Sequence, residues 1–226
     1  MITESEEKKS KLKFGSAEIF ALIIIGVLAI ILVYNTARIS NITGISGNVI
    51  SGGVLPSVST SEVIPKGVPE VYGKELDIRY DDISASNPKT TQSTIGILAN
   101  LDNSITLTGD DLQRYIKIGS MIACEYCCGA TTLVFSNGQP ACGCAHSYAM
   151  RGLEKYLIKN HRSEYTDDQI LEELGKWKVL FFPDVHIQKA AVLKSQGIEL
   201  NYINLASNKY RGIEQGASSG QMVGGC

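Results

Sequence analysis

The sequence predicts a mainly α-helical fold with a small β-hairpin, carried behind a single N-terminal transmembrane helix. Three observations support this prediction. An uncharged apolar stretch occupies residues 19–34, helical apolar stripes recur after residue 108, and five of the six cysteines fall between Cys124 and Cys144. We therefore expect a small exported helical domain with a treble-clef-like knuckle of cysteine and histidine.

The apolar stretch from Ile19 to Tyr34 holds sixteen residues without a charge. Counted from Ser16 to Asn35, it reaches the length of about 20 residues that a helix needs to span a bilayer. A run that is apolar on every face has no solvent side, which argues against a buried helix of a globular core. It is also longer than the apolar part of a cleaved signal peptide, which is about 7 to 15 residues. We expect an uncleaved anchor in the lipid bilayer.

Basic residues predict the orientation of this anchor. Four lysines lie between Lys8 and Lys13, whereas Arg38 is the only basic residue between the stretch and Lys66. The positive-inside rule then places the N-terminus in the cytoplasm and the C-terminal domain outside it. The net charge of −2, with scattered basic residues, gives no reason to expect nucleic-acid binding.

Composition and helix signals divide the chain into segments. Residues 36–66 are rich in Gly, Ser and Thr and nearly uncharged, which is typical of a tether. Residues 67–107 carry weaker signals, and within them TIGILANLDNSITLT fits either a helix or two short strands. The predicted segments are a cytoplasmic N-terminus (1–15), a transmembrane helix (16–35), a flexible linker (36–66), an irregular arm (67–107), a Cys/His metal-binding helical domain (108–206) and a disordered tail (207–226).

Start and stop signals within 108–206 predict successive helices. The expected helices follow Thr108 and stop at Gly119, run from His146 to about Asn160, follow a capping box of Thr166 and Gln169 up to Pro183, and run from Asp184 to Gly197. The segment ELNYINL fits a short strand or a fifth turn of helix.

The cysteine cluster carries the strongest functional signal. A C-x-x-C turn is followed by a β-prone segment, by Asn137-Gly138 as a hairpin signal, and by a second group of ligands that enters a helix. This is the order of a treble-clef metal site, in which a helix N-terminus favours thiolate over thiol. The candidate metal ligands are Cys124, Cys127, Cys128, Cys142, Cys144 and His146.

Zinc is the first candidate ion, because structural zinc takes four such ligands in a tetrahedron. Copper(I) is the second, because it prefers soft ligands and Met150 lies one helical turn past His146. An exported domain can also form disulfides, and a pair across the hairpin such as Cys124 with Cys144 stays open. The sixth cysteine, Cys226, lies far away on the predicted tail. His161 and His186 have no ligand spacing to the cluster, and no Ser-His-Asp order, phosphate-binding glycine loop or paired carboxylates favour an enzyme.

Two resemblances follow from these residues. The segment Glu125-Tyr126-Cys127-Cys128-Gly129, with Cys142-Gly143-Cys144, His-Ser and the later TDDQI, resembles in part the exported bacterial proteins named for a Pro-Cys-Tyr-Cys-Gly-Cys motif. That resemblance implies membrane attachment. The C-x-x-C with two helices, an acidic cap and a following proline is similar to the thiol-reductase subunit of cytochrome c maturation. This second resemblance implies redox work by Cys124 and Cys127, although that family lacks the extra cysteines and His146.

The sequence thus predicts a membrane-anchored, extracytoplasmic metal-binding protein. One alternative is an extracytoplasmic thiol–disulfide oxidoreductase that uses Cys124 and Cys127. Another is a pilin-like surface subunit, because Gly15 follows lysines and precedes an acidic residue, Glu18, at the start of the apolar stretch.

Overall fold

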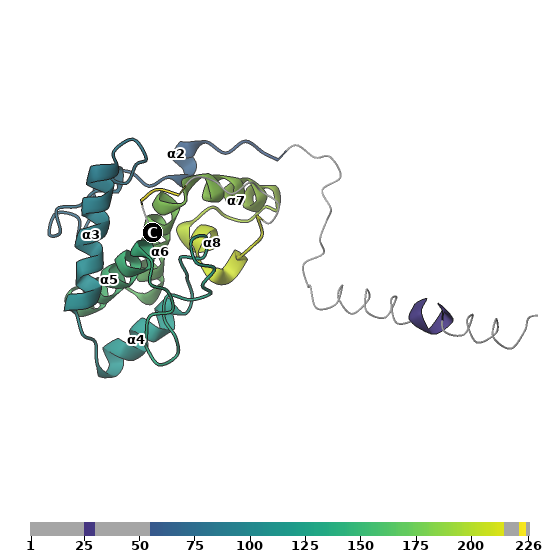
Figure 1. Cartoon of the computed structure of the whole chain (residues 1–226). Coiled ribbons are helices and arrows are strands. Elements are labelled where there is room, and N and C mark those ends of the chain that lie inside the picture. Colours follow the sequence, from purple (N-terminus) through teal and green to yellow (C-terminus); the bar gives the residue numbers. More distant parts are fainter. Residues whose placement is uncertain (1–24, 30–54, 215–221, 225–226) are drawn as a thin grey trace, which may run out of the picture. The chain divides into compact units, whose positions relative to one another are not determined.

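The computed structural model describes residues 25–29, 55–214 and 222–224, and the chain divides into two compact units, 1–53 and 54–226. The second unit is a mainly α-helical domain, and its described residues contain no sheet (Figure 1). Its elements are α2 (Thr60–Val63), η1 (Tyr80–Asp82), α3 (Pro88–Ser104), α4 (Gly109–Gly119), α5 (Ala145–Asn160), α6 (Asp167–Phe181), α7 (Pro183–Ser195), α8 (Tyr202–Ala206) and η2 (Asn208–Tyr210).

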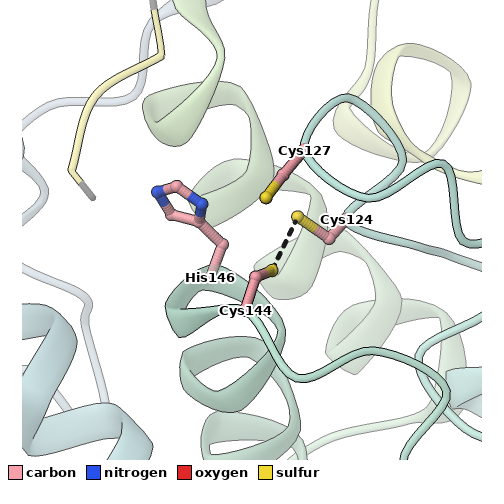
Figure 2. A group of neighbouring side chains, drawn as sticks. All are labelled: Cys124, Cys127, Cys144 and His146. Atoms are coloured by element: carbon pink, nitrogen blue, oxygen red, sulfur yellow. Dashed lines mark hydrogen bonds between the residues drawn. The ribbon is translucent and has the colours of Figure 1, made fainter. Parts of the chain in front are cut away.

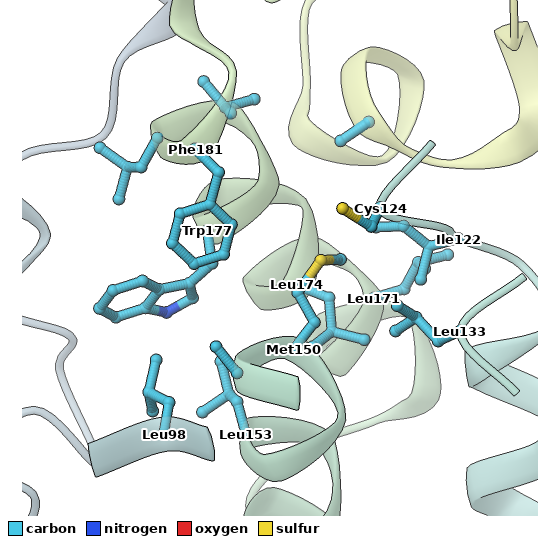
Figure 3. Packing of buried hydrophobic residues seen from close by; sticks show 14 of the residues in the cluster. Leu98, Ile122, Cys124, Leu133, Met150, Leu153, Leu171, Leu174, Trp177 and Phe181 are labelled. Carbon is cyan, nitrogen blue, oxygen red and sulfur yellow. The ribbon is translucent and has the colours of Figure 1, made fainter. Parts of the chain in front are cut away.

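Helix α5 lies at the centre of this domain. Its apolar stripe includes Met150 and Leu153, which are fully buried against Leu98 of α3 and Trp177 of α6 (Figure 3). The backbones of α3 and α5 meet at Gly152, where an added Cβ would lie 1.9 Å from the carbonyl oxygen of Leu98. Only a residue without a side chain permits this approach, so the glycine sets the distance between the two helices.

Helix α3 is the largest difference from the predicted segments, since it occupies the stretch expected to be an irregular arm. Pro88 stands at its first position, where the missing N–H costs nothing. Ile95 and Leu98 face the core together with the buried hydroxyls of Thr91 and Thr94. Threonines in place of aliphatic residues weaken the apolar rhythm, which is why the sequence left helix and strand open.

Both ends of the described domain are more ordered than predicted. In the expected linker, Ser59 and Glu62 form a capping box for α2, and Val63 is fully buried. In the expected tail, η2 follows α8, and Val223 is buried with its N–H bonded to the Phe181 carbonyl at 2.8 Å. These short apolar contacts involve single residues, so composition alone did not indicate them.

The predicted hairpin is reduced to one antiparallel bridge, between Val134 and Pro140. Its turn lies at the predicted place, with Gly138 at a φ of 79°. Phe135 donates to Gln139 and Ala141 donates to Leu133, but a proline lacks the N–H that would extend this ladder.

Most of the predicted transmembrane segment lies outside the described residues, as do the expected cytoplasmic N-terminus and Gly15. Residues 25–29 are helical, with Ile25, Val27 and Leu28 exposed. Among the helices of the described part of the chain, none has the length and apolar character needed to cross a membrane.

Candidate metal centre

The candidate centre is built by the loop between α4 and α5, residues 120–144, together with the first turn of α5. The loop has little regular hydrogen bonding of its own, and it is fixed to the domain by the buried side chains of Ile122, Leu133 and Val134. The Leu133 amide donates to the Gly119 carbonyl at 2.9 Å, where α4 ends. These anchors bring the start and the end of the loop together over the N-terminus of α5.

Four predicted ligands converge at this point: Cys124, Cys127, Cys144 and His146. One potential ligand atom from each lies within 4.8 Å of the others, so they form a cluster able to hold a metal ion (Figure 2). Cys124 and His146 are fully buried, and Cys144 is 8% exposed. The Sγ atoms of Cys124 and Cys144 are 3.3 Å apart.

The N-terminus of α5 stabilises negative charge on Cys144. This residue is the N-cap, and the Ser147 amide donates to its Sγ at 3.4 Å. The hydrogen bond with Cys124, then those with His146 and Ser147, lower the pKa of Cys144 to about 3. The same contact with Cys144, together with burial, raises the pKa of Cys124. We therefore assign the thiolate to Cys144 and the shared proton to Cys124.

His146 is held by the C-terminal part of the chain. Its Nε2 lies 2.9 Å from the Val223 carbonyl oxygen, which can only accept, so Nε2 carries the proton in this contact. The other ring nitrogen, Nδ1, is directed toward the sulfurs (Figure 2). A backbone carbonyl that fixes the tautomer in this way is the usual support of a metal-binding histidine. Phe181 packs beside the ring, with centroids 4.6 Å apart.

Cys128 and Cys142 form a disulfide, so in this state they provide no thiolate for the cluster. The six predicted ligands therefore fall into two groups, a cluster of four and a disulfide beside it. Cys144 belongs to both, because its sulfur also lies within 4.8 Å of those of Cys128 and Cys142. Cys127 is disulfide-bonded as well, whereas Cys124 and Cys144 are free thiols.

A buried lysine beneath the loop was missed in the sequence. Lys178 of α6 is fully buried, and its Nζ bonds to Glu125 at 2.6 Å and to the Ala206 carbonyl at 2.8 Å. Desolvation lowers the pKa of Lys178, and its charge acts to lower the pKa of Cys124. The available signal was its spacing, since residue 178 lies four positions after Leu174 on the inner face of α6.

The other sulfur-containing and histidine side chains discussed above lie away from the centre or outside the described residues. Met150 is a fully buried core residue. His161 contacts Glu75 at 3.0 Å and Glu164 at 2.9 Å, and His186 Nδ1 lies 2.7 Å from the Phe182 carbonyl. Cys226 falls outside the described residues.

Comparisons with protein-family models, with curated proteins and with solved structures find no match to this chain. Three cysteines and one histidine, a stabilised thiolate and a neighbouring disulfide allow two kinds of chemistry, metal binding and thiol–disulfide exchange.

Proposed function

We propose that this chain is a membrane-anchored, extracytoplasmic protein that binds one soft metal ion through Cys124, Cys127, Cys144 and His146. The observation that carries the proposal is the convergence of these four side chains, with His146 fixed by Val223. Cys₃His is a ligand set of structural zinc, which makes zinc the first candidate.

The residues fit such an ion in chemistry and in spacing. Zinc–sulfur bonds of about 2.3 Å in a tetrahedron place sulfurs about 3.8 Å apart. The Sγ separation of 3.3 Å between Cys124 and Cys144 and the 4.8 Å limit for the group bracket that distance. Cys124 and Cys144 are free thiols in the present state, and reduction of Cys127 adds a third cysteine ligand beside His146. Copper(I) is the second candidate, because soft thiolates select it.

Metal analysis of the full chain tests the proposal. We expect protein that is reduced with a phosphine and loaded without oxygen to retain about one zinc or copper(I) ion per chain after gel filtration. Cys144→Ser and His146→Asn should each lower the affinity at least about tenfold. The matched control is Cys128→Ser with Cys142→Ser, which removes two cysteines but leaves the four ligands. Equal loss of metal in the control and the site variants, or no retained ion in the parent protein, would refute the proposal.

The anchor is a separate part of the proposal and needs its own test. The uncharged stretch at 19–34 and the lysines before it support a single span with the domain outside the cytoplasm. We expect the chain to stay with membranes through an alkaline wash, and added protease to digest the domain from the outer side. Release by the wash would overturn the anchor without affecting the metal centre.

One observation favours a second function, thiol–disulfide oxidoreduction. The free thiols of Cys124 and Cys144 are 3.3 Å apart, and the pKa of Cys144 is lowered to about 3, as in reactive cysteines. The reactive pair would then be Cys124 and Cys144 rather than Cys124 and Cys127. Turnover of an external disulfide by metal-free protein, lost in Cys144→Ser, would favour this function.

A further inference from the structure

The four cysteines Cys124, Cys144, Cys142 and Cys128 are neighbours in space, and Cys124 is fully buried whereas Cys128 is exposed. Cys124 is fully buried and Cys144 is 8% exposed, Cys142 is partly buried, and Cys128 is exposed. The inner two are free thiols 3.3 Å apart, and the outer two form a disulfide. The sulfur of Cys144 is within 4.8 Å of both sulfurs of that disulfide.

We propose that Cys144 exchanges with the Cys128–Cys142 disulfide and transfers it inward to Cys124, so that the chain interconverts two disulfide isomers. In the outer isomer, Cys128 is bonded to Cys142 and the inner thiols are free. In the inner isomer, Cys124 is bonded to Cys144 and the outer thiols are free. Both isomers contain the same atoms and electrons, so no external oxidant is required.

The exchange proceeds by two ordinary substitutions at sulfur. The Cys144 thiolate attacks one sulfur of the outer disulfide, a new S–S bond forms, and the other cysteine leaves with the electron pair as a thiolate. Cys124 gives its proton to that thiolate and attacks the Cys144 sulfur. The bond between Cys144 and the outer cysteine breaks, and the second outer thiolate is released.

Position on α5 suits Cys144 to the central role. Cys144 is the N-cap of α5, and its Sγ accepts a hydrogen bond from the Ser147 amide at 3.4 Å. This hydrogen bond stabilises the attacking thiolate. The Cys144 sulfur is also the one shared by the two cysteine groups. A consequence, which rests on the proposed function, is that the inner isomer removes two metal ligands, so that the outer isomer is the one able to bind the ion.

The test uses the order of exposure. At the start, the free thiols of Cys124 and Cys144 are buried, whereas Cys128 is exposed but oxidised. The metal-free full chain in detergent micelles is incubated with N-ethylmaleimide at neutral pH without oxygen or redox buffer, for the minutes to hours that disulfide exchange takes. Exchange releases the outer thiols, which the maleimide then traps. We therefore expect label on Cys128 and Cys142, with Cys124 joined to Cys144.

Mapping of the label distinguishes each step. No Lys or Arg lies between Lys117 and Arg151, so chymotryptic peptides are analysed and sites are assigned from fragment ions. In Cys144→Ser the label on Cys128 should fall at least about tenfold, because no thiolate lies next to the outer disulfide. In Cys124→Ser only one outer cysteine should be labelled, because the mixed disulfide with Cys144 persists.

The unmutated chain alone can overturn the proposal, so a variant that fails to fold does not affect the result. Label confined to Cys124 and Cys144, with the outer disulfide intact, would show that no exchange occurs. Label on Cys128 that persists in Cys144→Ser, or that rises with protein concentration, would show exchange between molecules instead. Metal retention by the fully reduced chain is measured separately, so failure of the exchange and failure of the metal centre give different results.

Discussion

The helical core and the cysteine loop of this domain hold their shapes by different means. In the core, α3, α5 and α6 satisfy their own backbone hydrogen bonds and bury a continuous apolar surface around Trp177. The loop, residues 120–144, has one internal β-bridge, and its shape depends on a few anchors, a disulfide and a buried ion pair. Damage to the core should therefore unfold the whole domain, whereas damage to the loop should open the centre first.

The largest effect is expected where the core is tightest. Gly152→Ala adds a Cβ that would lie 1.9 Å from the Leu98 carbonyl oxygen, and a backbone atom cannot move aside without separating α3 from α5. We expect a loss of at least about 4 kcal/mol in the free energy of unfolding, measured by urea denaturation.

The control is Gly96→Ala in α3, where nothing lies within 4 Å of the added Cβ. Helix propensity should then stabilise the protein by up to about 1 kcal/mol. If both variants gained stability, the close approach of α3 and α5 would be disproved.

The next effect concerns the ion pair between loop and core. Glu125→Ala leaves the buried ammonium of Lys178 without its carboxylate partner at 2.6 Å, which should cost about 3 kcal/mol. Before global unfolding, we also expect faster alkylation of Cys124, because the loop is released first.

Lys194→Ala serves as the comparison for this prediction. It breaks a pair with Glu62 in which both side chains are more than 40% exposed, so it should cost less than about 1 kcal/mol. Equal costs for the two variants would mean that the Lys178 ammonium is solvated when its partner is lost.

The contrast between the helical core and the cysteine loop also explains how much of the structure could be predicted from the sequence. Local signals specified the helices that carry them: Thr166 and Gln169 form the predicted capping box of α6, and α4 stops at Gly119 as expected. Helix α3 was left open because its buried face mixes Thr94 with Ile95 and Leu98. Propensity and periodicity are local, so they fail where tertiary packing decides the structure.

The centre was predictable in its composition but not in its pairing. The spacing of Cys124, Cys127, Cys144 and His146 indicated a common point, and the structure brings them within 4.8 Å. That Cys128 pairs with Cys142 depends on the path of the loop in space, which cysteine spacing does not fix. The carbonyl of Val223 that supports His146 comes from 77 residues further along the chain, and no local signal marks it.

The smallest expected change in folding stability concerns Glu154, which lies where the helical core meets the cysteine loop. Glu154 of α5 is fully buried below Gly119, where the loop begins, and burial raises its pKa well above the ordinary value of 4.5. The folded chain therefore keeps this proton at a pH where the unfolded chain has released it. Folding stability falls as pH rises through 4.5 and stops falling above the raised pKa of the folded state. Glu154→Gln removes this penalty, so it should be more stable than the parent protein at pH 7.

Asp167 provides a comparison for Glu154, because its pKa is shifted in the opposite direction. Hydrogen bonds from Lys117 and Arg114 lower the pKa of Asp167, so its contribution is present at neutral pH and is lost as pH falls through the folded-state pKa. Asp167→Asn should therefore be less stable than the parent protein at pH 7, and Glu154→Gln more stable. The Glu154→Gln difference should shrink at pH 4, where Glu154 is protonated in most of the folded and unfolded chains alike. The Asp167→Asn difference should persist there, because it is lost only as pH falls below 3.8. If urea denaturation at pH 7 and pH 4 showed Glu154→Gln to be destabilised at both, Glu154 would be ionised and paired in the folded chain, and α5 would support the start of the loop through a charge.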